Sequence, residues 1–155
     1  MLIDLYGLGL LLGLAYHSYT DVRFLLLYDS TNCCLALLGL WRGWSSGLLM
    51  EAWQGCFLLL GLMLLVYYAS RGGMGEGDVK LAAVLGLWLG VEKGLACLLL
   101  AFVSGAVIGG SIILLQKKDG KKELPFGPYL ALSGFACYMY GNEILVWYGK
   151  FMGNW

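Results

Sequence analysis

An aspartate at the head of an apolar segment is the residue of this sequence best suited to chemistry. Residues 72–77 contain four glycines, and Asp78 follows them directly, ahead of the apolar run 81–91. A carboxylate at the start of a membrane-type helix is energetically unfavourable, so it marks a candidate functional site. Glycines allow tight turns and let a substrate backbone come close, which a Cβ would block. A structural role is also open, in which Asp78 caps a helix that begins at Val79.

Acid–base hydrolysis of a peptide bond needs a second carboxylate, and Asp21 is our preferred partner for Asp78. Two neighbouring acids repel each other as like charges, so the pair shares one proton. The ionised member takes a proton from water, and the protonated member donates to the carbonyl oxygen or the leaving amine. We expect the first long apolar run to form a helix that ends at Thr20–Asp21. Two other acids remain alternative partners on residue type and position alone: Asp29, in the loop that follows Asp21, and Glu76, two residues before Asp78.

Other site chemistries find less support. His17 is the only histidine, which argues against a histidine-based zinc site or a Ser-His-Asp triad, and we expect it near the membrane interface. The five cysteines form no Cys-x-x-Cys pair and are interpreted as buried, reduced thiols. The glycine segment lacks the Gly-Lys-Ser/Thr ending of a phosphate-binding loop, and no Gly-x-Ser-x-Gly motif occurs. We therefore expect no metal ion and no other cofactor.

The composition predicts an all-α membrane protein, a polytopic bundle of about six transmembrane helices in one domain, residues 1–155. Hydrophobic residues make up 60% of the 155 positions, and the mean hydropathy is +0.76. Charged residues make up 13%, about half of the ~25% usual in soluble domains. The ten basic and ten acidic residues leave no net charge, so nothing suggests binding to nucleic acid.

Six apolar segments are candidates to cross the bilayer: 2–19, 24–41, 48–69, 79–91, 94–115 and 130–148. Two of them, 24–41 and 79–91, are broken or short against the ~20 residues that a span needs. The first of these two can span only if its helix begins near Ser30 or continues beyond Arg42. Residues 116–123 form a polar loop with four lysines.

The basic residues discriminate between six spans and four. With six spans, seven basic residues share one side and three share the other: Arg23, Arg71, Lys80, Lys117, Lys118, Lys121 and Lys122 against Arg42, Lys93 and Lys150. With four spans the division is six to four. The positive-inside rule favours six spans, with the seven-charge side in the cytoplasm. Asp21 and Asp78 then lie on the same cytoplasmic face.

Three segments resemble the type IV prepilin peptidases, membrane aspartic proteases of the Gly-x-Gly-Asp class. Residues 73–81, GMGEGDVKL, followed by GLWLG at 86–90, are similar to the signature of that family, and PFGPYLAL at 125–132 resembles its last block. The first catalytic aspartate of the family is followed by basic residues and Ile-Pro-Asn/Asp. On this pattern Asp21 takes the catalytic place and Asp29 the Asn/Asp place, while Tyr28 stands in place of the proline.

The resemblance implies a catalytic pair of Asp21 and Asp78. It also implies a set of motif residues close to the substrate: Gly75, Glu76, Gly77, Lys80, Pro125, Phe126, Gly127 and Pro128. The implied substrate is a prepilin-like or pseudopilin precursor, cleaved behind its short basic leader at the cytoplasmic face of the inner membrane. Longer members also methylate the product. This chain lacks their extra N-terminal region and its Cys-x-x-Cys pairs, so we expect a peptidase without methyl transfer.

A different class of function is the alternative. The chain could be a small non-enzymatic membrane scaffold or a transport subunit, whose two aspartates bind ions or stabilise helices. Conduction needs polar residues through the bilayer, and few lie in the middle of these segments. Leader cleavage in membranes separates the two classes. The sequence names neither the physiological substrate nor the oligomeric state.

Overall fold

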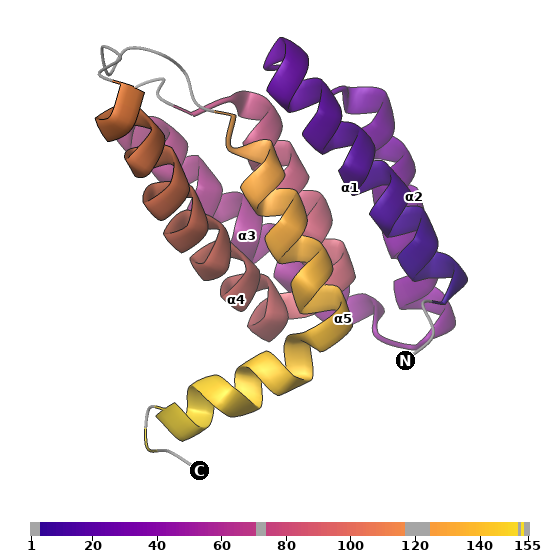
Figure 1. Cartoon of the computed structure of the whole chain (residues 1–155). Coiled ribbons are helices and arrows are strands. Elements are labelled where there is room, and N and C mark those ends of the chain that lie inside the picture. The colour runs from indigo at the N-terminus through magenta and orange to yellow at the C-terminus, as the bar shows by residue number, and fades with distance from the viewer. Residues whose placement is uncertain (1–3, 71–73, 117–124, 152, 154–155) are drawn as a thin grey trace.

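Every regular element of the described chain is an α-helix. The computed structural model describes residues 4–70, 74–116, 125–151 and 153. The helices are α1 (Leu5–Phe24), α2 (Asp29–Ser45), α3 (Leu49–Ala69), α4 (Glu76–Gln116) and α5 (Gly127–Phe151). Figure 1 shows them packed as a bundle, with α1 and α2 forming an antiparallel pair at one edge.

Helix α4 reverses direction at Gly90. The backbone there has φ 71° and ψ −165°, a conformation that glycine adopts and that strains other residues. Beyond it, Lys93 lies against Gly141 and Gly105 lies against Phe126, so the second stretch of α4 runs antiparallel to α5. Figure 1 shows the first stretch running the opposite way, and both ends of α4 lie at the same end of the bundle.

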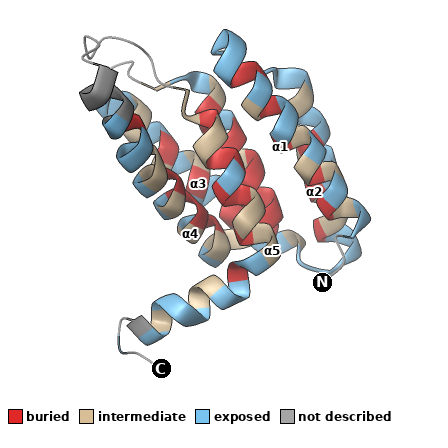
Figure 2. Cartoon of the chain, viewed as in Figure 1, coloured by how far each residue is buried: buried red, intermediate tan, exposed pale blue. Residues whose placement is uncertain are grey.

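The first stretch of α4, residues 76–89, forms the centre of the bundle. Its side chains from Val79 to Leu89 are mostly buried and point to every side of the helix. A helix that is apolar all round must be surrounded by other elements. Helix α3 packs directly on it through Gly55 and Gly86, where a Cβ on either residue would overlap the backbone of the other helix. Figure 2 shows the buried residues gathered in this central region.

The outside of the bundle is rich in large apolar side chains, among them the largely exposed Leu12, Trp41, Phe57 and Leu65. Exposed apolar surface on this scale is typical of contact with lipid. Helix α3 is long and apolar enough to cross a membrane, and residues Glu76–Gly109 of α4, interrupted by the reversal at Gly90, have a similarly apolar composition. The prediction of an all-α, membrane-type protein is confirmed.

The predicted count of six helices is not confirmed. Segments 79–91 and 94–115 both fall in α4, as two stretches that run in opposite directions on either side of Gly90. The last predicted span is not one straight helix, because α5 has non-helical backbone at Tyr140 (φ −124°, ψ 18°) and turns away from the bundle beyond it. Helix α2 both begins near Ser30 and continues beyond Arg42, as its membrane length requires. Residues 2–3, 71–73 and the lysine-rich loop 117–124 lie outside the described residues.

Candidate active site

Asp21 lies in the last turn of α1 and is 6% exposed. The prediction that it ends the helix is wrong by one turn, since α1 continues to Phe24. Leu25 then adopts a left-handed conformation (φ 53°, ψ 36°), and its N–H donates to the Asp21 carbonyl oxygen at 2.9 Å. Glycine is the usual residue at such a helix end. A leucine held there marks backbone strain beside the site, where strained residues tend to cluster.

Asp78 is the third residue of α4 and is also 6% exposed. The alternative structural role, a cap on a helix that begins at Val79, does not fit the structure, because α4 already begins at Glu76. The Asp78 N–H donates to the Gly75 carbonyl oxygen at 3.2 Å in the first turn. Its side-chain Oδ1 is buried and has no hydrogen-bond partner among the described residues. A buried, unpaired carboxylate oxygen is unfavourable and calls for a functional explanation.

The two carboxylates come together at one end of the bundle. Asp78 lies close enough to Asp21 for the two to interact electrostatically. The Oδ2 of Asp21 accepts a hydrogen bond of 2.8 Å from the N–H of Gly127, the first residue of α5. Three helices, α1, α4 and α5, therefore hold the pair.

Glycine is required at two of the motif positions because neighbouring elements approach closely there. A Cβ on Gly127 would lie 2.7 Å from the Asp21 Oδ2. A Cβ on Gly77 would lie 2.7 Å from the Cβ of Leu27, in the connection that follows α1. Gly75 is less restricted, with the Asp78 Oδ2 at an ordinary 3.5 Å from such an atom. The motif glycines thus let the first connection and α5 pack against the two aspartates.

Asp29 and Glu76 lie apart from the buried pair. Asp29 is the first residue of α2, and both its oxygens accept from the Lys80 Nζ, at 2.8 and 3.0 Å. The two side chains are 72% and 50% exposed. Glu76 is also exposed and accepts from the Tyr67 hydroxyl at 3.3 Å. Residue type alone left Asp21 and Asp29 as alternative partners for Asp78. The two differ in burial, because Asp21 is buried and Asp29 lies at the surface.

The segment at 125–128 forms the start of α5. Phe126 packs on Phe102 with ring centroids 5.2 Å apart, and its carbonyl oxygen accepts from the Tyr129 N–H at 3.1 Å. Pro128 is in the first turn of α5, where proline is tolerated because its missing N–H would have no helical partner. Pro125 is partly buried beside Phe126 in the chain. Together these residues direct the Gly127 N–H at Asp21.

Sequence reasoning missed a buried polar pair near the site. His17, expected at the interface, is fully buried one turn before Asp21, and Asn32 of α2 is 5% exposed. The two side chains face each other without a well-formed hydrogen bond to one another or to any other described residue. The spacing of four residues between His17 and Asp21 places both on one helix face, and this signal was available in the sequence.

The cysteines are only partly as expected. Cys97 and Cys137 are buried, Cys56 is partly buried, and Cys33 and Cys34 are exposed on α2. Within the described ranges, no three His, Cys, Asp or Glu side chains are grouped closely enough to hold a metal ion.

The fold and the site define an all-α, membrane-type protein with two buried carboxylates from different helices at one end of its bundle. Residues 8–110 match the type IV leader peptidase family, and the chain belongs to that family. A prepilin leader peptidase/N-methyltransferase of Stutzerimonas stutzeri is 37% identical over 147 residues, which are 90% of this chain and 50% of that protein. One of Legionella pneumophila is 30% identical over 162 residues, 100% of this chain and 54% of that protein.

A third relative matches a shorter part of the chain with higher sequence identity. The protein of the same name from Aeromonas salmonicida is 46% identical over 79 residues, 51% of this chain and 27% of that protein. At most, the chain spans about half the length of these relatives. No solved structure gives a significant match.

Proposed function

We propose that this chain is a membrane aspartic endopeptidase that removes the short basic leader of prepilin-like or pseudopilin precursors. Its family membership supports the class of reaction, since the relatives are named prepilin leader peptidases. The observation that carries the proposal is the burial of Asp21 and Asp78 in electrostatic contact at one end of the bundle. No feature of the described residues favours a scaffold or a transport subunit over this activity.

The surroundings of the two aspartates suggest separate roles. A backbone N–H that donates to a carboxylate favours its charged form, so Asp21, bonded to Gly127, is the proposed base. Asp78 is buried beside that charge, and its Oδ1 has no partner among the described residues. It is the proposed acid, which donates a proton to the substrate carbonyl oxygen or to the leaving amine. Asp21 takes a proton from the water that attacks the carbonyl carbon.

We place the reaction at the cytoplasmic face of the inner membrane. The reversal of α4 at Gly90 supports this orientation, because it returns the chain to the end that holds Asp21 and Asp78. The sequence predicts seven basic residues on that side and three on the other, and the positive-inside rule then assigns that end to the cytoplasm. From Asp78 to Gly90 the helix rises only about 18 Å, against a hydrocarbon core of ~30 Å. The site is therefore proposed to lie below the membrane surface, near the junction between a leader and its apolar helix.

The exposed acids at the same end offer a partner for a basic leader. Glu76 and Asp29 lie at the surface near Lys80, and Lys80 forms its ion pair with Asp29. Glu76 is left as the acid best placed to attract positive charge in the leader. We expect Glu76→Gln to keep the maximal rate and to raise KM, while Glu76→Lys raises KM further.

The test is cleavage of a prepilin-like precursor by membranes that contain matched amounts of each variant. Asp21→Asn and Asp78→Asn keep the size of the side chain and remove its acid–base function. Each should remove nearly all activity, and the double variant should be hardly worse than either, because the pair acts as a unit. Asp29→Asn is the matched control and should remain active.

Two outcomes would overturn the proposal. An active Asp21→Asn enzyme beside an inactive Asp29→Asn enzyme would transfer the role to Asp29. A well-folded wild-type chain that cleaves no precursor would favour the non-enzymatic class.

A further inference from the structure

A charged pocket lies at the end of the bundle opposite the two aspartates. It has a volume of about 120 Å³ and is lined by residues of α2, α3, α4 and α5. The charged and aromatic members are Arg42, Glu51, Trp88, Lys93 and Tyr138, and Gly90 forms part of its wall. Its volume is several times the ~30 Å³ of one liquid water, which is enough for a group the size of phosphate.

Arg42 is held in place by contacts that are not ion pairs. Its Nη1 donates to the Trp88 carbonyl oxygen at 3.0 Å, and its guanidinium lies 5.2 Å from the centre of the Tyr138 ring. Trp88 is fixed in turn, since its Nε1 donates to the Leu35 carbonyl oxygen at 2.9 Å. The guanidinium has five N–H donors, so several remain for a ligand. The group is thus pre-oriented, and binding through it sacrifices little side-chain freedom.

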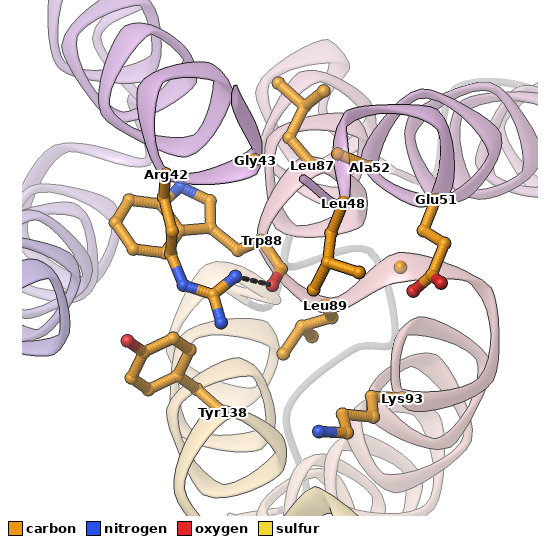
Figure 3. A pocket seen from close by; sticks show the side chains of 11 residues that line it. Arg42, Gly43, Leu48, Glu51, Ala52, Leu87, Trp88, Leu89, Lys93 and Tyr138 are labelled. Atoms are coloured by element: carbon orange, nitrogen blue, oxygen red, sulfur yellow. Dashed lines mark hydrogen bonds between the residues drawn. The ribbon is translucent and has the colours of Figure 1, made fainter. Parts of the chain in front are cut away.

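Lys93 supplies a second cation from α4. Its stem packs against Gly141 of α5, where an added Cβ would meet it at 2.7 Å. Figure 3 shows its ammonium pointing toward the side of the pocket that holds Arg42 and Tyr138, with the Glu51 carboxylate on another wall. The single ion pair within 4.0 Å among the described residues is Lys80–Asp29, so neither Arg42 nor Lys93 has an acid at that distance. With Glu51 included, the residues that line the pocket carry one net positive charge, and the exposed Asp4, which accepts from the Tyr138 hydroxyl at 2.8 Å, lies beside them.

We propose that this pocket binds a phosphate group with a single negative charge, as in the phosphodiester of a membrane lipid headgroup. Arg42 would donate to two phosphate oxygens with its planar fork, and Lys93 would act as the opposing point charge. Trp41, Trp44 and Trp53 lie close by in sequence on α2 and α3. Trp41 and Trp44 are 67% and 74% exposed, and tryptophan concentrates at the level of the headgroups. A lipid phosphate is therefore within reach of the pocket.

The experiment measures ligand-dependent thermal unfolding of the detergent-purified full chain. The probes are sodium phosphate and dihexanoyl phosphatidylglycerol, each compared with sodium chloride at equal ionic strength. A ligand that binds the folded state raises the unfolding midpoint in a saturable way. Lys93→Gln should weaken the apparent affinity roughly tenfold, the usual effect of losing a hydrogen bond to a charged group. Glu51→Gln removes the repelling carboxylate and should strengthen binding.

Lys150→Gln is the matched control, because Lys150 is an exposed cation of α5 outside the pocket. It should bind the probe like the wild type. Saturation by the lipid alone would identify a headgroup site, and equal saturation by phosphate would identify a site for the free anion. Absence of saturation with both probes contradicts the proposal, as does an equal loss in Lys150→Gln and Lys93→Gln. If Lys93→Gln cannot be purified, unchanged affinity in Glu51→Gln is equally decisive against it.

Discussion

Replacing Gly127 by alanine should disable the proposed site while leaving the bundle folded. The new methyl group would lie 2.7 Å from the Oδ2 and 3.0 Å from the Cγ of Asp21, both well inside normal contact. Gly127 is not among the described glycines with positive φ, and the three atoms nearest to the added methyl group all belong to Asp21. The carboxylate must move away, and its 2.8 Å hydrogen bond from the Gly127 N–H is lost or lengthened.

The size of the effect follows from that hydrogen bond and from the displacement. A hydrogen bond to a charged group contributes about 1.5–3 kcal/mol, which corresponds to about one to two orders of magnitude in rate. A displacement of about 1 Å at a reacting group can alone cost roughly 10²-fold. We therefore expect kcat/KM for precursor cleavage to fall by roughly 10- to 100-fold per folded molecule. Rates should be measured well below the unfolding midpoint of the variant.

Gly61→Ala is the matched control for this substitution. It makes the same chemical change in a helix, at a position with no atom within 4 Å of the added methyl group. Its rate should equal that of the wild type. A Gly127→Ala enzyme with wild-type kcat/KM would refute the reasoning, as would a loss of rate that Gly61→Ala reproduces.

Three further predictions concern stability and topology. Gly90→Ala should destabilise the fold by about 1–3 kcal/mol in thermal unfolding, because its backbone geometry strains any side chain, whereas Gly61→Ala should not. Asp29→Asn removes an exposed ion pair and should cost less than about 1 kcal/mol, again by thermal unfolding; a larger loss would show that the pair is structural. In a cysteine-free background, an impermeant thiol reagent added outside should label a cysteine at Ser45 and miss one at Ser70; the opposite pattern would reverse the proposed orientation.

The two aspartates show what residue type and sequence position can predict by themselves. Asp21 and Asp78 attract attention in the sequence because Asp21 follows a long apolar run and Asp78 stands at the head of another apolar segment. The cost of burying a charge is a property of each residue by itself. The choice between Asp21 and Asp29 is different. Both follow the first apolar run, and only the packing shows one buried against Gly127 and the other exposed beside Lys80.

The class of fold is likewise a local property. Transfer from water to lipid is favourable residue by residue, so the apolar runs predict helices in a membrane without knowledge of their neighbours. Helix ends are less well determined, because caps and packing move them by a turn, as at Phe24 and Glu76.

Contacts between residues far apart in the sequence decided the other features of the structure. Three features depend on which helices become neighbours: the reversal at Gly90, the burial of His17, and the presence of Arg42 and Lys93 in one pocket. A glycine in an apolar run shows no sign in the sequence of whether it bends the chain, as Gly90 does, or admits a neighbouring helix, as Gly86 does. That distinction arises from close packing between helices, whose energy depends on shape complementarity across the fold and not on the composition of either helix.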